Sequence, residues 1–119
     1  MKTFNDELLQ IKANAASVKF FEHRGYTIKS ANENSPAPIV AIDEESETLV
    51  FASVLVSKEG FASEETPREV MEQAAAEYLA AHAEELPENV TIRFDAVGVL
   101  VLSPERAMIR HHINCLGSM

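Results

Sequence analysis

The sequence predicts an α/β protein in which a mixed β-sheet lies between helices. Two segments repeat apolar residues with a helical period, and five shorter segments have strand character, in the order α-β-β-β-α-β-β. The segment 48–56, TLVFASVLV, is apolar on both faces, as in strands buried inside a covered sheet. The length of 119 residues fits one domain, residues 1–119.

The first helix is expected over residues 6–24, where apolar residues recur at spacings of four, three and four. This spacing predicts a single face that packs against the sheet. The predicted face consists of Leu9, Ala13, Ala16 and Phe20. Gly25 follows directly, and a glycine in the left-handed conformation commonly ends a helix.

Three strands are then expected at residues 26–30, 39–43 and 48–56. The turn-prone segment NENSPAP separates the first two, and an acidic turn over 44–47 separates the second from the third. Since the third strand is the most apolar, we expect it to be central in the sheet.

The second helix has two start signals. Thr66 and Glu69 have the spacing of a capping box, and Pro67 falls at the first helical position, where its missing N–H costs nothing. The helix is expected to end between residues 82 and 85, before Pro87. Its apolar stripe is predicted to comprise Val70, Ala74, Tyr78 and Ala81.

Two more strands complete the prediction. Residues 90–102 alternate in polarity, and Gly98 marks an expected bend or β-bulge. Residues 107–114 form the expected last strand. His111 and His112 are neighbours in that strand, so their side chains point to opposite faces and cannot bind one metal together.

The charge distribution disfavours nucleic-acid binding. The net charge is −9, and residues 31–89 carry two basic and fourteen acidic side chains, a balance of −12. Nucleic-acid binding needs cations near the phosphates, whereas this region would repel them. We therefore expect nucleic-acid binding to be weak or absent.

Composition disfavours several other classes of protein. No apolar run approaches the roughly 18 residues that span a bilayer, and residues 1–10 lack the apolar core of a signal peptide, so we expect a cytoplasmic protein without membrane contact. Cys115 is the only cysteine, which excludes an internal disulfide and leaves a zinc site short of ligands. The four glycines form no phosphate-binding loop, and no cofactor is predicted.

Several fragments occur in the order and at the spacing of a known family, namely FFEHRGYTI, ETLVF, AAAEYLAAH, IRFDAVGV and HHIN. On these fragments, residues 13–116 resemble the YraN-like family. This family is a branch of the PD-(D/E)XK nuclease superfamily, related to Holliday-junction resolvases and restriction endonucleases. The resemblance implies a restriction-endonuclease-like fold, with a mixed sheet between helices in three layers.

Members of that family bind Mg²⁺ through an aspartate and a glutamate, a lysine positions the attacking water, and a glutamate of the first helix completes the site. Aligned on ETLVF, the aspartate position falls on Val40, the glutamate on Ser53 and the lysine on Leu55. Aligned on the Gly25-Tyr26 pair, the helical glutamate falls on Asn14. All four positions lack the required group, so the resemblance implies a degenerate active site without catalytic or metal-binding residues.

The sequence contains a few other candidates for catalytic or metal-binding residues. Asp95 matches an aspartate of the family that is not one of its four active-site residues. Cys115 has no catalytic motif around it, so we expect a partly buried, inert thiol. The acidic turn offers carboxylates for a relocated Mg²⁺ site, although such turns are usually only solvated. These carboxylates belong to Asp43, Glu44, Glu45 and Glu47.

The sequence therefore predicts a catalytically inactive nuclease-fold protein that acts as a binding or scaffolding module, with an unknown protein partner or a second copy of itself. One alternative is a metal-dependent DNA endonuclease with relocated ligands. Another is a non-catalytic nucleic-acid-binding protein that uses the less acidic terminal segments, around Lys12, Lys19, Arg24 and Lys29.

Aliphatic side chains at the vacated site would form an exposed apolar floor unless another segment covers them. We therefore expect Leu55 to be buried under residues 31–38, residues 57–65 or a partner subunit.

Overall fold

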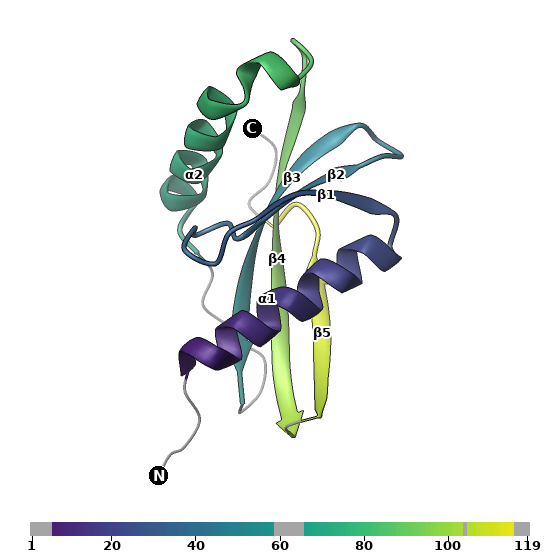
Figure 1. The fold of residues 1–119 in the computed structure, drawn as a ribbon, viewed down its shortest axis with the longest axis vertical. Coiled ribbons are helices and arrows are strands. Elements are labelled where there is room, and N and C mark those ends of the chain that lie inside the picture. The colour runs from purple at the N-terminus through teal and green to yellow at the C-terminus, as the bar shows by residue number, and fades with distance from the viewer. Residues whose placement is uncertain (1–5, 59–65, 104, 116–119) are drawn as a thin grey trace.

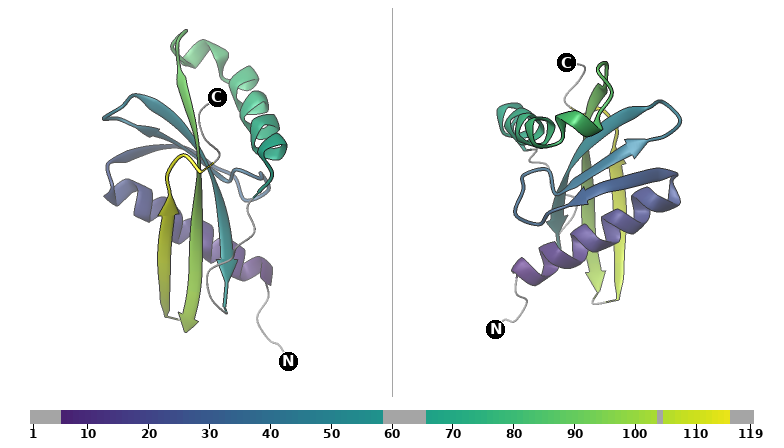
Figure 2. Two further views of the ribbon diagram at one scale, coloured as in Figure 1. Left: turned by 180° about the vertical axis from the view of Figure 1, so that it is seen from behind. Right: turned by 45° about the horizontal axis from the view of Figure 1, so that its top comes forward.

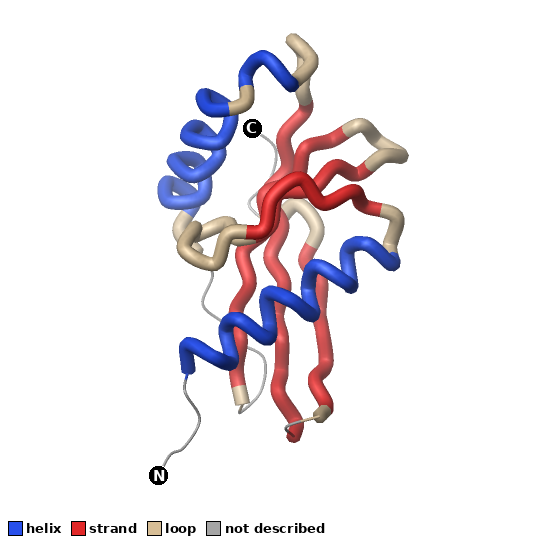
Figure 3. The backbone as a smooth tube through the Cα atoms, viewed as in Figure 1, coloured by secondary structure: helices blue, strands red, loops and turns tan. Residues whose placement is uncertain are grey.

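The computed structural model describes residues 6–58, 66–103 and 105–115 (Figures 1 and 3). Within these ranges, two α-helices, one short 3₁₀-helix and five strands follow one another in the predicted order of α and β elements. Their bounds are α1 Asp6–His23, β1 Tyr26–Ala31, β2 Ile39–Asp43, β3 Thr48–Ser57, α2 Arg68–Ala81, η1 Ala83–Glu85, β4 Thr91–Ser103 and β5 Arg106–His112.

The described strands form one mixed sheet in the order β1-β2-β3-β4-β5. Neighbouring strands pair antiparallel except β3 and β4, which run parallel. A parallel pair needs a long connection, which explains why a helix, α2, lies between these two strands in the sequence. The prediction that β3 is the central strand is confirmed.

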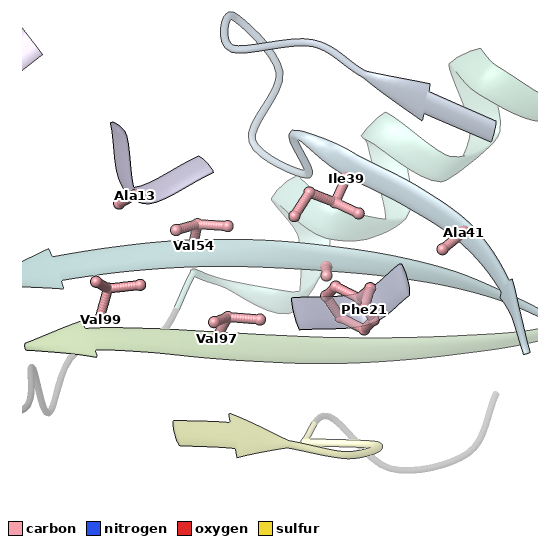
Figure 4. Packing of buried hydrophobic residues seen from close by; sticks show 8 residues of the cluster. Ala13, Phe21, Ile39, Ala41, Val54, Val97 and Val99 are labelled. Atoms are coloured by element: carbon pink, nitrogen blue, oxygen red, sulfur yellow. The ribbon is translucent and has the colours of Figure 1, made fainter. Parts of the chain in front are cut away.

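The helix α1 crosses one side of the sheet (Figure 1), which we call the α1 face. Side chains alternate along each strand, so every second residue of β2, β3 and β4 points to this face. Figure 4 shows these side chains converging with two from α1, and Phe21 is fully buried. The buried cluster comprises Ala13, Phe21, Ile39, Ala41, Ala52, Val54, Val97 and Val99.

The helix α2 lies on the opposite side of the sheet (Figure 2), which we call the α2 face. The ring of Tyr78 meets Phe51 edge-on, with 5.7 Å between centroids. The buried cluster on this face comprises Ala37, Val40, Leu49, Phe51, Met71, Ala75 and Phe94. Together the two clusters place the sheet between two helical layers, which confirms the predicted three-layer α/β arrangement.

The buried face of α1 is shifted from the predicted one. Ala16 and Phe20 are half-buried, whereas Ser17 and Phe21 are fully buried. Ser17 tolerates burial because its hydroxyl donates a hydrogen bond of 2.7 Å to the carbonyl four residues earlier, so its polar group is satisfied inside the helix. Gly25 follows the helix with a φ of 88°, as predicted.

The predicted capping box of α2 is wrong. Pro67 is the N-cap instead of the first helical residue, and no side chain caps this end of the helix. The Pro67 backbone is extended, and its carbonyl accepts the N–H groups of Val70 and Met71. Thr66 therefore lies one residue too early for its hydroxyl to act as the cap.

The predicted apolar stripe of α2 is only partly correct. Ala74 and Tyr78 pack against the cluster, but Val70 is 39% exposed and Ala81 is exposed. Met71 and Ala75, four residues apart, are the buried residues of the helix. Because Val70 and Met71 are adjacent apolar residues, periodicity alone did not decide which of them faces the sheet.

The sheet is regular at Gly98, where we expected a bend or bulge. Gly98 pairs in unbroken register with Leu55 on β3 and with Arg110 on β5. The register shift of the β4–β5 pair lies between Val101 and Ser103, next to the turn that joins the two strands. This is where β-bulges commonly accommodate twist.

Candidate functional site

Three of the four positions that the family resemblance assigns to an active site lie on the α2 face. Val40 pairs with Phe51 across β2 and β3, and Ser53 is the next residue of β3 on the same face. Val40 is 5% exposed within the apolar cluster, and Ser53 is 3% exposed. Hard cations such as Mg²⁺ need several oxygen ligands, and these residues offer a single hydroxyl.

Asn14, the fourth of these positions, lies on α1 and therefore on the other side of the sheet. Its side-chain oxygen accepts a hydrogen bond of 3.0 Å from Gln10, whose amide also donates to the Val54 carbonyl at 3.1 Å. The Asn14 amide nitrogen is buried and has no partner among the described residues. The structure thus does not bring Asn14 together with the other three positions.

Leu55 is only half-buried, so the expectation that it is buried is wrong. The apolar cluster under α2 includes Leu49 and Phe51 but does not extend to Leu55. Of the expected covering segments, residues 31–38 pack through Ala37 beside Val40, and residues 59–65 lie outside the described ranges.

The acidic turn does not gather its carboxylates around one point. Asp43 bonds to Arg93, with 3.3 Å between Oδ2 and Nη1, and Glu44 accepts a hydrogen bond from the Thr27 hydroxyl. Among the residues in the described ranges, no group of three or more histidine, cysteine or carboxylate side chains could hold a metal ion.

The sequence reasoning missed a buried polar cluster on the α1 face, and we call it the Asp95 cluster. Asp95 is fully buried and accepts four hydrogen bonds. Arg93 donates two of them, at 2.9 Å and 2.8 Å, as a fork on both carboxylate oxygens. The His111 ring lies at 2.7 Å from Oδ2, and the Asn114 backbone N–H donates at 2.8 Å to Oδ1.

The other groups of Arg93 extend the Asp95 cluster to the first two strands. Its Nη2 donates a hydrogen bond of 2.7 Å to the Tyr26 hydroxyl, in addition to the ion pair with Asp43. The His111 ring is packed between aromatic edges, with its centroid 4.8 Å from Phe21 and 6.2 Å from Tyr26. The cluster therefore ties β1, β2, β4 and β5 together beneath α1.

Hydrogen bonding dominates the electrostatics of the Asp95 cluster. Burial alone would raise the pKa of Asp95, but the hydrogen bonds from His111, Arg93 and the Asn114 N–H lower it below its ordinary value. Burial would likewise lower the pKa of Arg93, yet its bonds to Asp95 and Tyr26 raise it. Both side chains remain charged at neutral pH, and the acceptor sites of Asp95 are occupied, so the cluster is suited to stabilising the fold.

Two features of the sequence are consistent with this cluster, namely the spacing of Arg93 and Asp95 and the alternation of His111 and His112. Arg93 and Asp95 stand two residues apart on a strand, so their side chains share a face. His111 and His112 do point to opposite faces, as predicted, because His111 bonds to Asp95 while His112 is exposed.

Cys115 is half-buried, as expected, and its backbone N–H donates a hydrogen bond of 2.9 Å to the Phe94 carbonyl.

A cavity of about 340 Å³ lies on the α2 face between residues 32–37 and α2, and we call it the loop–α2 cavity. Val40 and Phe51 lie at its floor but are only 5% and 1% exposed, and the apolar lining residues with accessible surface are Pro36, Ala74 and Tyr78. Burial and the nearby Glu85 carboxylate raise the pKa of Tyr78, so its phenol stays protonated at neutral pH. The residues that line the cavity include Ser30, Asn34, Val40, Glu77, Tyr78 and His82.

Comparison with known proteins adds no assignment: no family model matches the chain, and no curated protein matches it. Within the described ranges, neither helix combines the length and the apolar character required to cross a membrane.

Proposed function

We propose that this protein is a non-catalytic binding or scaffolding module with a restriction-endonuclease-like fold. The observation that carries the proposal is the burial of Val40 and Ser53, which occupy the positions where the family that the chain resembles has metal-binding carboxylates. A carboxylate at position 40 would lie among Leu49, Phe51 and Met71, where burying an ion without a partner costs several kcal/mol.

The surroundings of Asp43 do not favour the alternative of a relocated nuclease site. Its carboxylate is already paired with Arg93, and no second carboxylate of the acidic turn joins that pair. A divalent ion at this place would have to compete with a guanidinium held by Asp95.

Nucleic-acid binding is also a weak alternative. The basic side chains of α1 and β1 lie on a protein with a net charge of −9, and the guanidinium of Arg24 stacks on Phe20 at 4.7 Å. We expect duplex or four-way-junction DNA to bind no better than ordinary non-specific affinity, about 10⁻⁴–10⁻⁶ M at physiological salt.

The test is incubation of the purified protein with plasmid and four-way-junction DNA in Mg²⁺ or Mn²⁺, with EDTA as the blank. We expect no EDTA-sensitive cutting. Cutting that survives repeated purification would overturn the proposal. If Asp43→Asn then abolished it while Glu105→Gln did not, the relocated site would be established.

Binding is measured separately by mobility shift at low salt and at about 150 mM salt. A sub-micromolar dissociation constant at the higher salt would replace the proposed function with nucleic-acid binding.

A further inference from the structure

The loop–α2 cavity has one wall built by an irregularity of β1. Ile28 pairs with Ala41, and Ser30 pairs with the adjacent residue Val40, so Lys29 is an extra residue in the strand. Such a bulge reverses the alternation of side chains, and it brings Ser30 to the α2 face, where it lines the cavity. Bulges are common next to binding sites because they redirect a side chain in this way.

The loop above the cavity is fixed by its own hydrogen bonds. The Asn32 N–H donates to the Pro38 carbonyl at 2.8 Å, and the Ser35 N–H donates to the Asn32 carbonyl at 3.1 Å. Two side chains add further bonds: Asn32 accepts the Asn34 N–H at 3.0 Å, and Ser35 accepts the Ala37 N–H at 3.1 Å. The cavity is thus formed without a ligand, which removes the ordering cost of binding.

The opposite wall is the C-terminal half of α2. The rings of Tyr78 and His82 stack at 4.0 Å, and the His82 Nδ1 lies 2.9 Å from the Tyr78 carbonyl. Glu77 stands beside them with its carboxylate exposed, and one of its oxygens accepts a bond of 3.1 Å from Gln73. The second carboxylate oxygen has no protein partner within the described residues.

The charge around the cavity favours a positively charged ligand. Glu77 is the only aspartate, glutamate, lysine or arginine among the described residues that line it. The protein as a whole carries a net charge of −9. An anion would therefore be repelled, whereas a cation would be attracted by the carboxylate and by the aromatic ring of Tyr78.

We propose that the loop–α2 cavity binds a small organic cation, an amine with a compact apolar body. The apolar body would pack on Ala74 and the ring of Tyr78, which are only half-buried. The ammonium would lie between Glu77 and the polar loop side chains Ser30 and Asn34. The volume is at the lower end of the range for small-molecule sites, which fits a ligand of this size. This inference goes beyond the proposed function and is independent of the outcome of the nuclease assay.

The test uses three probes with the same ring: phenethylamine, phenethyl alcohol and phenylacetate. Each is titrated into the isotope-labelled full chain, and backbone amide shifts are followed. We expect saturable shifts confined to residues 30–37 and 74–82, with the amine binding at least about fivefold tighter than the alcohol and phenylacetate binding most weakly.

Two variants of α2 provide the matched pair. Glu77→Gln should reduce the affinity for the amine by about fivefold and leave the alcohol unchanged, because only the charge interaction is lost. Glu69→Gln removes an exposed carboxylate of the same helix that does not line the cavity, and it should change neither affinity. The proposal is overturned by equal binding of amine and alcohol, by the absence of saturable shifts, or by an amine affinity that Glu77→Gln does not lower.

Discussion

The two faces of the sheet are built differently. On the α1 face, the Asp95 cluster is enclosed by aromatic rings, and its central carboxylate has no exposed surface. On the α2 face, the buried residues of the strands are almost entirely apolar, a cavity remains beside Val40, and Leu55 is only half-buried. The α1 face is thus organised around a buried ionic cluster, and its cavities under α1 measure about 210 and 180 Å³, whereas the loop–α2 cavity on the other face measures about 340 Å³.

This difference suggests that the two faces have different roles, one in the stability of the fold and the other in ligand binding. A buried ionic cluster costs desolvation and is destabilising unless its bonds are satisfied, so substitutions there should be poorly tolerated. An apolar face with a cavity depends on non-directional packing and leaves room for a ligand. We therefore expect substitutions in the Asp95 cluster to lower the free energy of unfolding most, and the α2 face to carry binding.

The largest effect is expected for Asp95→Ala. It leaves Arg93 and His111 buried without their acceptor, and breaking a buried pair in this way costs about 3–5 kcal/mol of unfolding free energy. Asp43→Ala, at the more exposed end of the same cluster, should cost no more than about 1 kcal/mol. Chemical denaturation of both variants measures the difference, and equal losses would show that the cluster does not centre on Asp95.

The next largest effect distinguishes two positions on the α2 face. Val40→Asp introduces a carboxylate among apolar side chains, and burying this charge should destabilise the protein by several kcal/mol at neutral pH. Leu55→Lys should cost clearly less, because a half-buried side chain lets the ammonium reach water. Leu55→Met is the size control and should cost under about 1.5 kcal/mol. Denaturation curves in which Leu55→Lys is the more harmful variant would mean that the Leu55 site is enclosed.

A smaller effect is expected in acid. The ordinary pKa of Asp95 is 3.8, and the hydrogen bonds of the cluster lower it in the folded protein. The Asp95 carboxylate of the unfolded chain is therefore protonated at a higher pH than that of the folded protein. The stabilisation by the charged carboxylate is complete well above pH 3.8 and is lost as the pH falls through the pKa of Asp95 in the folded protein. The unfolding free energy of Asp95→Asn should fall less steeply below about pH 4 than that of the parent. Parallel curves for the two proteins would contradict a lowered pKa.

The smallest effect is expected at the start of α2, outside both buried clusters. A capping threonine contributes about 1 kcal/mol, but Thr66 makes no capping bond, so Thr66→Ala should change the stability by less than about 0.5 kcal/mol. Thermal unfolding of the pair is sufficient to measure this. A loss near 1 kcal/mol would show that the helix begins one residue earlier in solution.

Much of the fold was predictable because the sheet leaves a strong signal in the sequence. The segment 48–56 is apolar on both faces, and a strand with that pattern has to be covered on both sides, which fixed β3 at the centre. The helix faces were harder to assign, because Ser17 satisfies its own hydroxyl while buried and because Val70 and Met71 are equally apolar neighbours.

The candidate site was less predictable from sequence. Val40 and Ser53 were singled out through a resemblance, but their burial depends on the packing of α2, which no local pattern specifies. The Asp95 cluster was missed because a charged residue usually indicates a solvated position, and its partner His111 lies sixteen residues away on another strand. The loop–α2 cavity depends on a one-residue bulge, whose place the sequence does not reveal.

The parallel pairing of β3 with β4 has a consequence for the order of folding. The other strand pairs join neighbours in the sequence, so residues 26–57 and residues 91–112 can each form local hairpins quickly. The contacts of β3 with β4 require the chain to close a much longer loop, and such non-local pairing is slow. We expect the contacts between β3 and β4 to form in the folding transition state. A substitution such as Val50→Ala should then mainly slow refolding, whereas a substitution at the β4–β5 turn should mainly accelerate unfolding.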